Sequence, residues 1–354
     1  MKVGIITFTE GYNFGNKLKN YALLSYIKKI SNNDVYTINN HITQGTFLNK
    51  VKVLLVWSIP SKKHIQYWFR LYKFKKFNKN YLKLTKEKLK NSTKKFEHVD
   101  IFVCGSDQIW NPNYYSNIDL LTGNLLKPVF SISYAASFGI EQLPENLKDS
   151  FKNSLTNLKE ISIRENQGKK ICDELGLKNS HVNIDPTFLL TKEEWETVIA
   201  RPKKKIPKKY ILTYFLGGLD KKKDKFVNEY CKKMNCERID LNSTNYLYWF
   251  NIDPFEFLYL IFHSELVCTD SFHASVFSII FNKRFVTFDR KNNENISNKM
   301  SSRIDTLFDL FQCTNNRFEH FDGNLESLKL NEKFVVEIIE KEKEKSYLYL
   351  SKYL

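Results

Sequence analysis

Between residues 265 and 281 the chain reads ELVCTDSFHASVFSIIF, a short apolar run, a polar turn and a longer apolar run. The first run predicts a buried strand at Leu266 to Cys268, and the second predicts a helix at Ala274 to Phe281. A strand that leads through polar residues into a helix is the repeating unit of a parallel α/β sheet. This stretch therefore predicts an α/β fold that presents polar side chains at the carboxyl end of a strand.

The same alternation of short apolar runs and helical patterns continues through both halves of the chain. We expect helices at Lys17 to Ile30, Asn146 to Asn157, Lys223 to Met234, Pro254 to His263, Arg303 to Phe311 and from Glu332 to the end. We expect further strands at Val3 to Phe8, Val35 to Ile38, Ile101 to Cys104, Val129 to Tyr134, Ile161 to Arg164, His181 to Ile184, Tyr210 to Phe215, Arg238 to Leu241 and Phe285 to Phe288.

The length of the chain predicts two domains, because 354 residues exceed what one hydrophobic core usually supports. The stretch RPKKKIPKK at 201–209 contains two prolines, six cations and one apolar residue, which is typical of an exposed connection. We expect an N-terminal α/β domain at 1–200, a second α/β domain at 201–325, and a helix at 326–354 that packs back across both.

Most of the excess positive charge lies in one segment. The formal charge is +16, and residues 50–95 contain fifteen Lys or Arg and a single acid, Glu87. Three interpretations remain open: a solvated helix face whose aromatic residues lie in the core, an interfacial segment on an anionic membrane, and a nucleic-acid surface. No recognition motif accompanies the charge, so nucleic acid is not the expected partner. The aromatic residues of the segment include Trp57, Trp68, Phe69, Tyr72, Phe74 and Phe77.

The sequence predicts neither a signal peptide nor a membrane span. It begins directly with the strand pattern MKVGIITF, and no apolar stretch approaches the roughly 20 residues that a transmembrane helix needs. The six cysteines are scattered without the paired spacing of a zinc site, so we expect reduced thiols. We therefore expect a cytoplasmic protein, with residues 50–95 as a candidate contact to the inner face of the plasma membrane.

The polar turn of the opening stretch is the first candidate site. Asp270, Ser271 and His273 would stand at the start of a helix, where free N–H groups and the positive end of the helix dipole favour a phosphate or carboxylate. His273 can exchange a proton near neutral pH. The alternative is that Asp270 and Ser271 only cap the helix and that His273 only packs.

Two further junctions carry polar residues at predicted strand ends. Asp107 and Gln108 follow one strand, and Arg164 ends another, where its guanidinium could hold a carboxylate or phosphate. The alternatives are a structural turn capped by Asp107 and a surface pair between Arg164 and Glu165. Isolated cations are more often solvated than functional, and this applies to three that follow the last strand, Arg290, Lys291 and Arg303.

Other kinds of site find little support. Gly11 to Asn16 contains two glycines but is neither a G-x-G-x-x-G fingerprint nor a P-loop. The seven histidines are dispersed, and no metal-ligand constellation or serine-hydrolase elbow occurs. The strand ends offer Arg, His and Asp, which suit a site that holds a small anion and moves protons without a metal.

Six motifs in order resemble the polysaccharide pyruvyltransferase family, over residues 1 to about 312. Members similar to this chain usually have Gln where Lys19 stands and Gly where Ala274 stands, and some have Arg where Ser271 stands. The motifs are NFGNKLKNYAL at 13–23, GSDQIWNP at 105–112, SISYAASFG at 131–139, SIREN at 162–166, DPT at 185–187 and DSFHAS at 270–275.

The resemblance implies two Rossmann-like βα domains in a GT-B-like arrangement, with the active site in the interdomain cleft. It implies phosphoenolpyruvate as the donor substrate, no cofactor, and a glycan acceptor, free or polyprenyl-linked, that receives a pyruvate ketal. By motif, Arg164 and His273 would contact the donor. The remaining roles are inferred from position: His273 as acid with Asp107 or Glu10 as base, then Ser271, Ala274, Ser275, Arg290 and Lys291 for the donor, and Glu10, Asn13, Asn16 and Gln108 for the acceptor or the cleft.

Two other functions remain open at this point. A nucleotide-sugar glycosyltransferase of the same fold would need a pocket for base and ribose, and we recognise none in the second half of the chain. A non-catalytic scaffold in envelope polysaccharide assembly would need no reactive groups, so Arg164 and His273 favour an enzyme over a scaffold.

Overall fold

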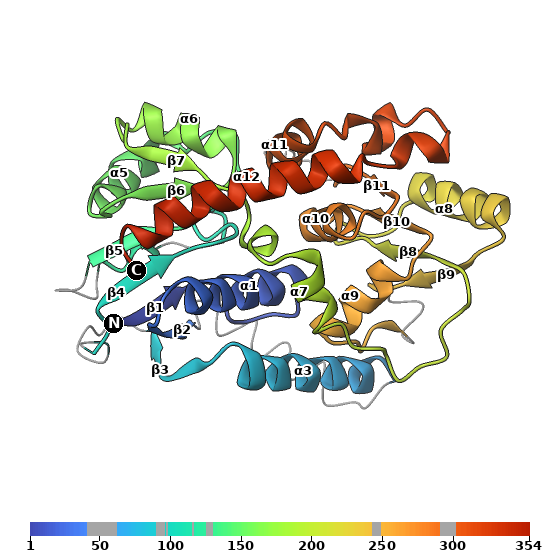
Figure 1. The fold of residues 1–354 in the computed structure, drawn as a ribbon, viewed down its shortest axis with the longest axis horizontal. Helices are drawn as coiled ribbons and strands as arrows, with labels where there is room; N and C mark the ends of the chain where they lie inside the picture. The colour runs from blue at the N-terminus through green and yellow to red at the C-terminus, as the bar shows by residue number, and fades with distance from the viewer. Residues whose placement is uncertain are drawn as a thin grey trace.

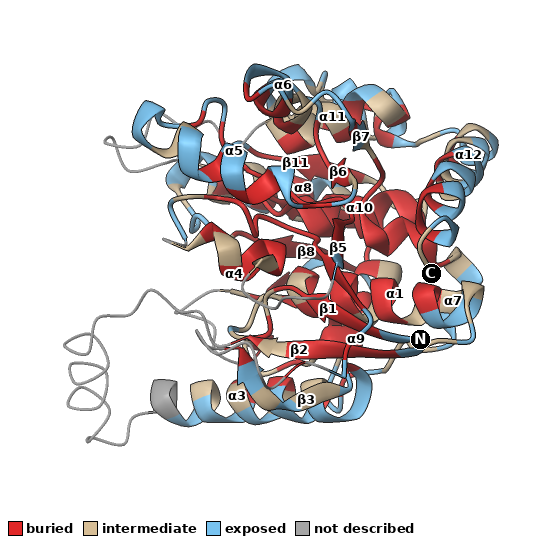
Figure 2. Ribbon diagram, turned by 90° about the vertical axis from the view of Figure 1, so that its left-hand side faces the viewer, coloured by how far each residue is buried: buried red, intermediate tan, exposed pale blue. Residues whose placement is uncertain are grey.

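Two parallel sheets form two lobes that lie side by side in the computed structural model (Figure 1). The structure describes residues 1–40, 62–89, 96, 98–114, 117–124, 130–242, 249–290 and 302–354. The sheets and the inner sides of the helices are buried, whereas the outer sides of α3, α5 and α12 are exposed (Figure 2).

The first lobe is built on a parallel sheet in the order β3-β2-β1-β4-β5. A pair of short strands continues beside β5 through a bridge between Ala136 and Ile163. Since β2 and β4 lie on opposite sides of β1, the winding reverses there, and such a switch point opens a crevice at the carboxyl ends of the strands. The strands are β1 (Lys2–Ile6), β2 (Asp34–Asn40), β3 (Leu84–Leu89), β4 (Ile101–Cys104), β5 (Phe130–Ser133), β6 (Ile161–Ile163) and β7 (Ser180–Val182).

The second lobe has a parallel sheet in the order β11-β10-β8-β9. Here β9 and β10 flank β8, so a second switch point lies beside β8. Two Rossmann-like lobes that face one another confirm the predicted α/β fold of GT-B-like arrangement. The strands are β8 (Tyr210–Tyr214), β9 (Glu237–Asp240), β10 (Leu266–Thr269) and β11 (Phe285–Thr287).

The predicted strands and helices are present, with bounds that differ by at most three residues. Val129, the predicted start of one strand, lies outside the described residues. Strand β3 was not predicted because LTKEKL lies at the edge of its sheet, where lysines face solvent and no apolar alternation develops. The helices are α1 (Phe14–Ile30), α3 (Lys62–Tyr81), α4 (Ile118–Thr122), α5 (Lys148–Thr156), α6 (Asn166–Glu174), α7 (Lys192–Glu196), α8 (Lys221–Met234), α9 (Pro254–Phe262), α10 (Phe272–Ile280), α11 (Ser302–Phe311) and α12 (Glu332–Ser351).

One apolar cluster runs through both lobes. Phe14 of α1 stacks on Phe257 of α9 with ring centroids 4.5 Å apart. Trp195 of α7 packs against Tyr21 of α1 and Phe277 of α10, at 5.7 and 5.0 Å. Each buried aromatic side chain contributes about 1.5–3 kcal/mol. Helices α1, α9 and α10 therefore pack the two lobes together. In this arrangement the strands of both sheets end at the same cleft between the lobes.

The C-terminal helix α12 crosses both lobes (Figure 1). Its last turns are fixed to β5, because the Tyr349 hydroxyl donates to the Ser133 carbonyl at 2.8 Å and the Tyr134 hydroxyl donates to Ser346 Oγ at 2.9 Å. It also contacts α11 of the second lobe. None of the helices in the described ranges is long and apolar enough to cross a membrane.

Docking of α12 should make a measurable contribution to stability. Leu350 is fully buried, so we expect Leu350→Ala to lower the free energy of unfolding by about 2–5 kcal/mol. Leu348, two residues earlier and 63% exposed, is the matched control, and Leu348→Ala should change stability by less than about 0.5 kcal/mol. Urea unfolding of both variants measures the difference, and equal midpoints would show that α12 is not packed as described.

Candidate functional site

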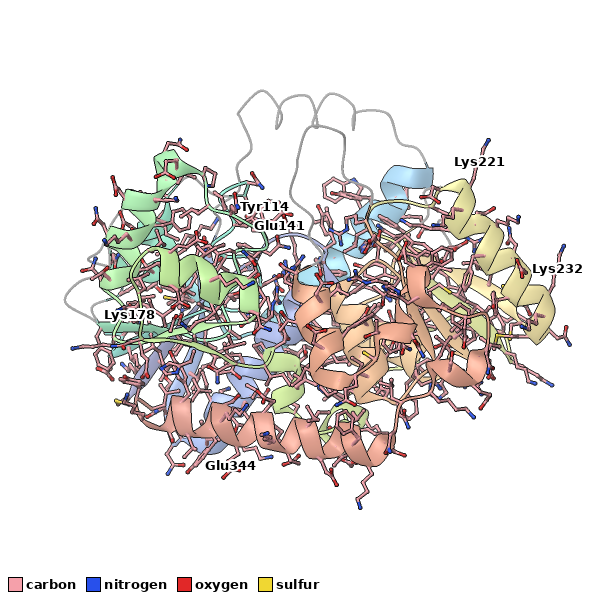
Figure 3. All side chains as sticks on the ribbon, turned by 90° about the horizontal axis from the view of Figure 1, so that it is seen from above. Tyr114, Glu141, Lys178, Lys221, Lys232 and Glu344 are labelled. Carbon is pink, nitrogen blue, oxygen red and sulfur yellow. The ribbon has the colours of Figure 1, made fainter. Side chains whose placement is uncertain are left out.

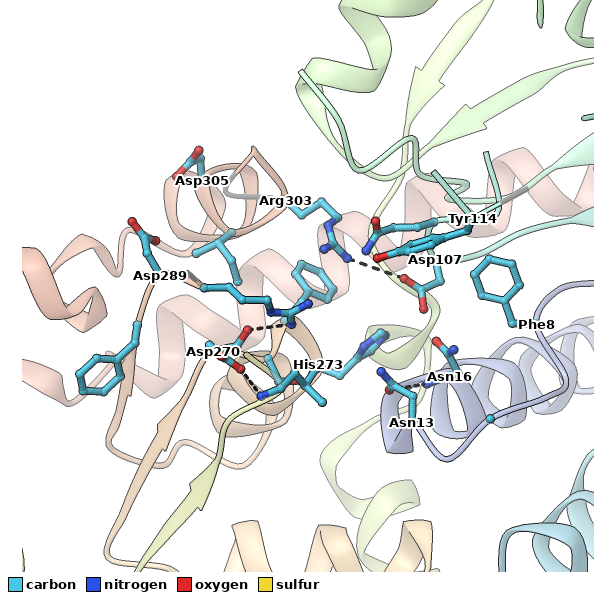
Figure 4. Close-up of a pocket in the computed structure, with 18 of the residues that line it drawn as sticks. Phe8, Asn13, Asn16, Asp107, Tyr114, Asp270, His273, Asp289, Arg303 and Asp305 are labelled. Carbon is cyan, nitrogen blue, oxygen red and sulfur yellow. Dashed lines mark hydrogen bonds and ion pairs between the residues drawn. The ribbon is translucent and has the colours of Figure 1, made fainter. Parts of the chain in front are cut away.

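A cavity of about 760 Å³ lies between the lobes at the carboxyl ends of their central strands (Figure 4). Loops after β1, β4, β8, β10 and β11 reach it, as two facing switch points predict. The first lobe supplies mostly amide, carboxylate and aromatic side chains, and the second supplies His273 and three arginines. In the described part of the chain, no group of three His, Cys, Asp or Glu could hold a metal ion.

His273 reaches across from the second lobe and touches the first. It stands in the first turn of α10 and points toward Asn13 and Asn16 at the start of α1 (Figure 4). Its ring lies directly on Gly15, where an added Cβ would be 2.1 Å from the imidazole Nδ1. Glycine at the centre of the NFGN motif is therefore required by the close approach of His273.

Arg164 lies between two buried carboxylates, those of Asp107 and Asp185. Its Nη1 donates to Asp185 Oδ2 at 2.8 Å, and its Nη2 lies 3.3 Å from Asp107 Oδ1. The guanidinium also stacks over the ring of Phe272, 4.5 Å from its centroid. His273 Nε2 is 3.7 Å from the same Asp185 oxygen, so the guanidinium and the imidazole share one carboxylate. Arg164 belongs to the first lobe and His273 to the second.

Neighbouring charges decide which groups of this network stay ionised, since burial opposes every charge. Burial raises the pKa of Asp107, but the cations around it, Arg164 foremost, outweigh burial and hold that pKa well below its usual range. For His273 burial dominates and lowers the pKa to about 4, although Asp185 and Asp107 act in the opposite direction. At neutral pH a neutral imidazole therefore lies beside carboxylates that remain charged.

Arg164 lines a second cavity of about 390 Å³, which Arg303 and Phe272 also line, and its role in binding the donor stays a prediction. Arg164 does not line the main cavity, and its guanidinium nitrogens face Asp107, Asp185 and Glu165. Strand β6 lies beside β5, away from the switch point at β1. Arg164, which follows β6, therefore approaches Asp107 and Asp185 from a side other than the main cavity. The alternative of a surface pair with Glu165 is wrong, because both side chains are buried.

Glu165 accounts for two of the motifs at once. Its Oε1 accepts hydrogen bonds from Ser137 Oγ at 2.9 Å and from the N–H groups of Phe138 and Gly139 at 3.0 and 3.2 Å. The carboxylate thereby fixes the turn at 137–139, which brings Gly139 so close to Gln108 that a Cβ would be 2.3 Å from its side-chain amide group. The SxRE and SYAASFG motifs therefore build the wall on which Gln108 rests.

Arg303 and the predicted donor residue Arg290 line the main cavity. Arg303 Nη1 lies 3.7 Å from Asp107 Oδ1, and the Gln108 oxygen, turned toward it, accepts from Nη1 and Nη2 at 3.0 and 2.8 Å. Burial lowers the pKa of Arg303 to about 10, which still leaves a cation at neutral pH. Arg290 Nη2 donates to the backbone oxygen of Asp270 at 3.2 Å. The predicted donor residue Lys291 lies outside the described residues.

The DSFH turn combines residues that face the cavity with residues that hold the turn. Asp270 accepts from the N–H groups of residues 216 and 217, at 2.6 and 2.9 Å, so it ties the loop after β8 to β10. Ser271 lines the cavity and caps α10. Ala274 and Ser275 do not line the main cavity, and both N–H groups donate to Ser271, so their role in binding the donor stays a prediction.

The wall from the first lobe carries amide and aromatic groups. Asn13 caps α1 by accepting from the Asn16 N–H at 3.3 Å, and Asn16 Oδ1 has no hydrogen-bond partner among the described residues. Glu10, Phe8 and Tyr114 line the same wall. Amides that donate and accept, next to aromatic faces, can bind the hydroxyls and ring faces of a sugar.

Lys19 is a buried cation. In the sequence it stood out only as a lysine at a position where similar family members usually have Gln. Its Nζ donates to the Ser106 carbonyl at 2.6 Å and to Thr7 Oγ1, and its side chain is fully buried. Burial lowers the pKa of Lys19 to about 8. The lysine fixes the peptide before Asp107, whose φ of 71° is costly for a residue other than glycine.

Three residues of the site were not predicted from the sequence, for different reasons. Asp185 was present in the DPT motif but received no role, although a carboxylate after a strand end was the available signal. Arg303 was treated as solvated, because only the return of α11 to the cleft brings it beside Asp107. Lys19 reads as an ordinary helix lysine, and only its depth of burial marks it.

Comparison with known protein families agrees with the resemblance seen in the sequence. The family model described as polysaccharide pyruvyl transferase matches residues 13–292. No curated protein matches the chain.

Similar solved structures include UDP-GlcNAc 2-epimerases. That of Neisseria meningitidis, bound to UDP-GlcNAc, is 12% identical over 98% of this chain and 100% of its own, with a TM-score of 0.42. That of Methanocaldococcus jannaschii is 14% identical over 96% and 99%, with a TM-score of 0.45. Anabaena Alr3699/HepE, in complex with UDP and glucose, is 8% identical over 99% and 100%, with a TM-score of 0.46.

His273 should remain neutral far below the usual range of a histidine. Because burial lowers its pKa to about 4, we expect the imidazole resonances to stay unchanged from neutral pH down to about pH 5. An NMR titration of the free protein measures this, with His273→Asn to identify the signal. A midpoint at or above about 6.5 would contradict the dominance of burial over the neighbouring carboxylates.

Arg164 should be more important for folding than an arginine of similar pairing at the surface. Arg164→Met leaves Asp107 and Asp185 without their shared cation, and we expect a loss of about 3–5 kcal/mol. Arg284 pairs with the exposed Glu326, so Arg284→Met should cost at most about 1 kcal/mol. Denaturant unfolding of both variants tests the contrast, and equal losses would contradict the buried network.

Proposed function

This chain belongs to the polysaccharide pyruvyl transferase family, and we propose that it transfers pyruvate from phosphoenolpyruvate to a sugar of a surface polysaccharide or of its lipid-linked precursor. The product would be a pyruvate ketal that bridges two sugar hydroxyls. Phosphoenolpyruvate is made in the cytoplasm, so the reaction is expected there. No cofactor is part of this proposal.

The observation that carries the proposal is the division of the cavity into two chemically different walls. The second lobe brings Arg290, Arg303 and the start of α10 to one side, together with three aspartates, Asp270, Asp289 and Asp305. The first lobe brings Asn13, Asn16 and aromatic side chains to the other. A small anionic donor can bind the arginines of the second-lobe wall, and a neutral sugar fits the first-lobe wall. His273 stands where the two walls meet.

The donor carries a carboxylate and a phosphate, and each can take two parallel hydrogen bonds from a guanidinium. Arg290 and Arg303 line the cavity and are the groups that we assign to these anions. Arg164 has a different task in this scheme. It keeps Asp107 and Asp185 ionised and in place, so it is a positioning residue.

The proton steps follow from the ionisation of the site. The neutral imidazole of His273 accepts the proton of the attacking sugar hydroxyl, and Asp185 stabilises the imidazolium that forms. The imidazolium then gives this proton to the methylene carbon C3 as the sugar oxygen bonds to C2. The sugar alkoxy group and the proton are thereby added across the double bond, at C2 and C3 respectively. His273 thus serves first as base and then as acid, whereas sequence analysis expected the acid role alone.

The second half of the reaction expels phosphate. The bond between C2 and the phosphate oxygen breaks with its electron pair on oxygen, which leaves positive charge at C2. Asp107, held ionised beside the cavity, can stabilise that charge, but its low pKa makes it a weak base. A second sugar hydroxyl then attacks C2 and closes the ketal, and Glu10 on the same wall is the candidate to take its proton.

The test combines donor binding with turnover. We expect phosphoenolpyruvate to raise the melting temperature of the protein and UDP-sugars to leave it unchanged. At 100 times its Kd, phosphoenolpyruvate would add about 2.7 kcal/mol to the free energy of unfolding. Arg303→Met should abolish the shift. His273→Asn should keep the fold and lower acceptor-dependent phosphate release by about 10²–10⁴-fold.

His263 is exposed at the end of α9, away from the cavity, so His263→Asn is the matched control and should keep full activity. Mass spectrometry of the glycan should show the increment of a pyruvate ketal. Stabilisation by a UDP-sugar but not by phosphoenolpyruvate would instead support a nucleotide-sugar glycosyltransferase. Near-normal turnover of His273→Asn would remove His273 from the mechanism.

A further inference from the structure

Helix α3 (Lys62–Tyr81) has an inner side that is fastened to both lobes. Phe74 and Phe77 are buried there, and Arg70 stacks on Phe14, with its guanidinium 4.9 Å from the ring centroid. Arg70 also donates to the Tyr12 carbonyl at 3.0 Å. Lys73 reaches the second lobe through an ion pair with Glu256 at 2.5 Å. The helix is therefore held in one orientation.

The opposite side of α3 exposes large apolar side chains. Ile65, Phe69 and Tyr72 are 47%, 54% and 65% exposed, and Trp68 is 58% exposed. These positions are three or four residues apart, so they form one stripe along the helix. The interpretation that the aromatic residues of 50–95 lie in the core is therefore correct for Phe74 and Phe77 and wrong for this stripe.

Lysines extend the stripe toward the end of the helix. Lys75, Lys76 and Lys79 are exposed and follow Tyr72 at the same helical spacing. We define the α3 face as Ile65, Trp68, Phe69, Tyr72, Lys75, Lys76 and Lys79. No acid occurs within Lys62–Tyr81, so the face combines apolar surface with positive charge alone.

We propose that the α3 face docks on an anionic lipid bilayer. Aromatic side chains on a helix lie at the boundary between headgroups and acyl chains, while lysines beside them pair with anionic headgroups. A nucleic-acid surface is less well matched, because phosphate binding needs cations and would leave the apolar stripe in water. The charge complementarity and the apolar area therefore point to the same occupant.

The place of α3 links docking to the cleft. Tyr67 on α3 donates from its hydroxyl to the Tyr12 hydroxyl at 2.6 Å, and Tyr12 stands between Gly11 and Asn13, which line the cavity. The wall that we assign to the acceptor is thus attached to the inner side of the helix whose outer side would face lipid. This orientation rests on the proposed function, because it presents the wall to an acceptor held at the membrane.

The test is flotation of the full-length protein with vesicles, without any turnover assay. We expect binding to vesicles of phosphatidylglycerol and phosphatidylcholine at about 0.1 M salt, and none to phosphatidylcholine alone. Phe69→Ser with Tyr72→Ser should weaken binding at least about tenfold. Lys75→Glu with Lys76→Glu should weaken it by more than about 25-fold, since each lysine near the surface contributes about fivefold.

Matched controls lie on other helices. Lys221 and Lys232 extend from α8 into solvent (Figure 3), so Lys221→Glu with Lys232→Glu makes the same change in net charge away from α3. Tyr347 and Leu348 on α12 are 46% and 63% exposed, so Tyr347→Ser with Leu348→Ser removes a comparable apolar area. Both control variants should float like the unchanged protein, and all four should keep its melting temperature.

Three results would overturn the proposal. The first is a protein that stays in the soluble fraction with anionic vesicles. The second is an equal loss of binding in the α8 control, which would mean that net charge alone acts. The third is tighter binding to duplex DNA or RNA than to the vesicles, which would identify a nucleic-acid surface. Donor binding and turnover are measured separately, so failure here leaves the proposed function standing.

Discussion

The arrangement of the cleft depends on two carboxylates that are buried and still charged. Asp107 and Asp185 stay ionised because Arg164 lies between them, and removal of one partner from such a group would cost several kcal/mol. The three residues come from loops after β4, β6 and β7, so this one ion-pair network fixes where three loops meet. His273 approaches the same Asp185 oxygen from the other lobe, which ties the meeting of the lobes to it as well.

The surrounding structure gives this network its shape. Gly15 leaves room for the His273 ring, Glu165 holds the turn under Gln108, and Lys19 holds the peptide before Asp107. Gly15, Glu165 and Lys19 are themselves held in place, because an apolar cluster runs through both lobes and α12 spans them. The lobes thus present a preformed pair of walls, one with arginines and aspartates and the other rich in amides.

The same division gives the molecule a direction. The arginines that would hold a small anion belong to the second lobe, whereas the amide wall adjoins α3, with its exposed aromatic and lysine face. In the proposed reaction a soluble donor and a large glycan would therefore enter from different chemical surroundings. A low pKa of His273 suits that scheme, because a neutral imidazole can accept the proton of a hydroxyl.

The sequence by itself determined most of the order of strands and helices, because apolar periodicity is local, but the edge strand β3 has no such pattern and was missed. It also located Asp107 and His273, since polar residues after a strand stand at the carboxyl edge of a parallel sheet. It could not tell how Arg164 and Arg303 would be paired, because both contacts with Asp107 depend on sheet order and on the return of α11, which bring together residues that are far apart in the sequence. Nor could it tell that Phe77 is buried while Phe69 is exposed, because both read alike along the helix. Only the tertiary structure settles such choices, since burial is a property of what packs against a side chain.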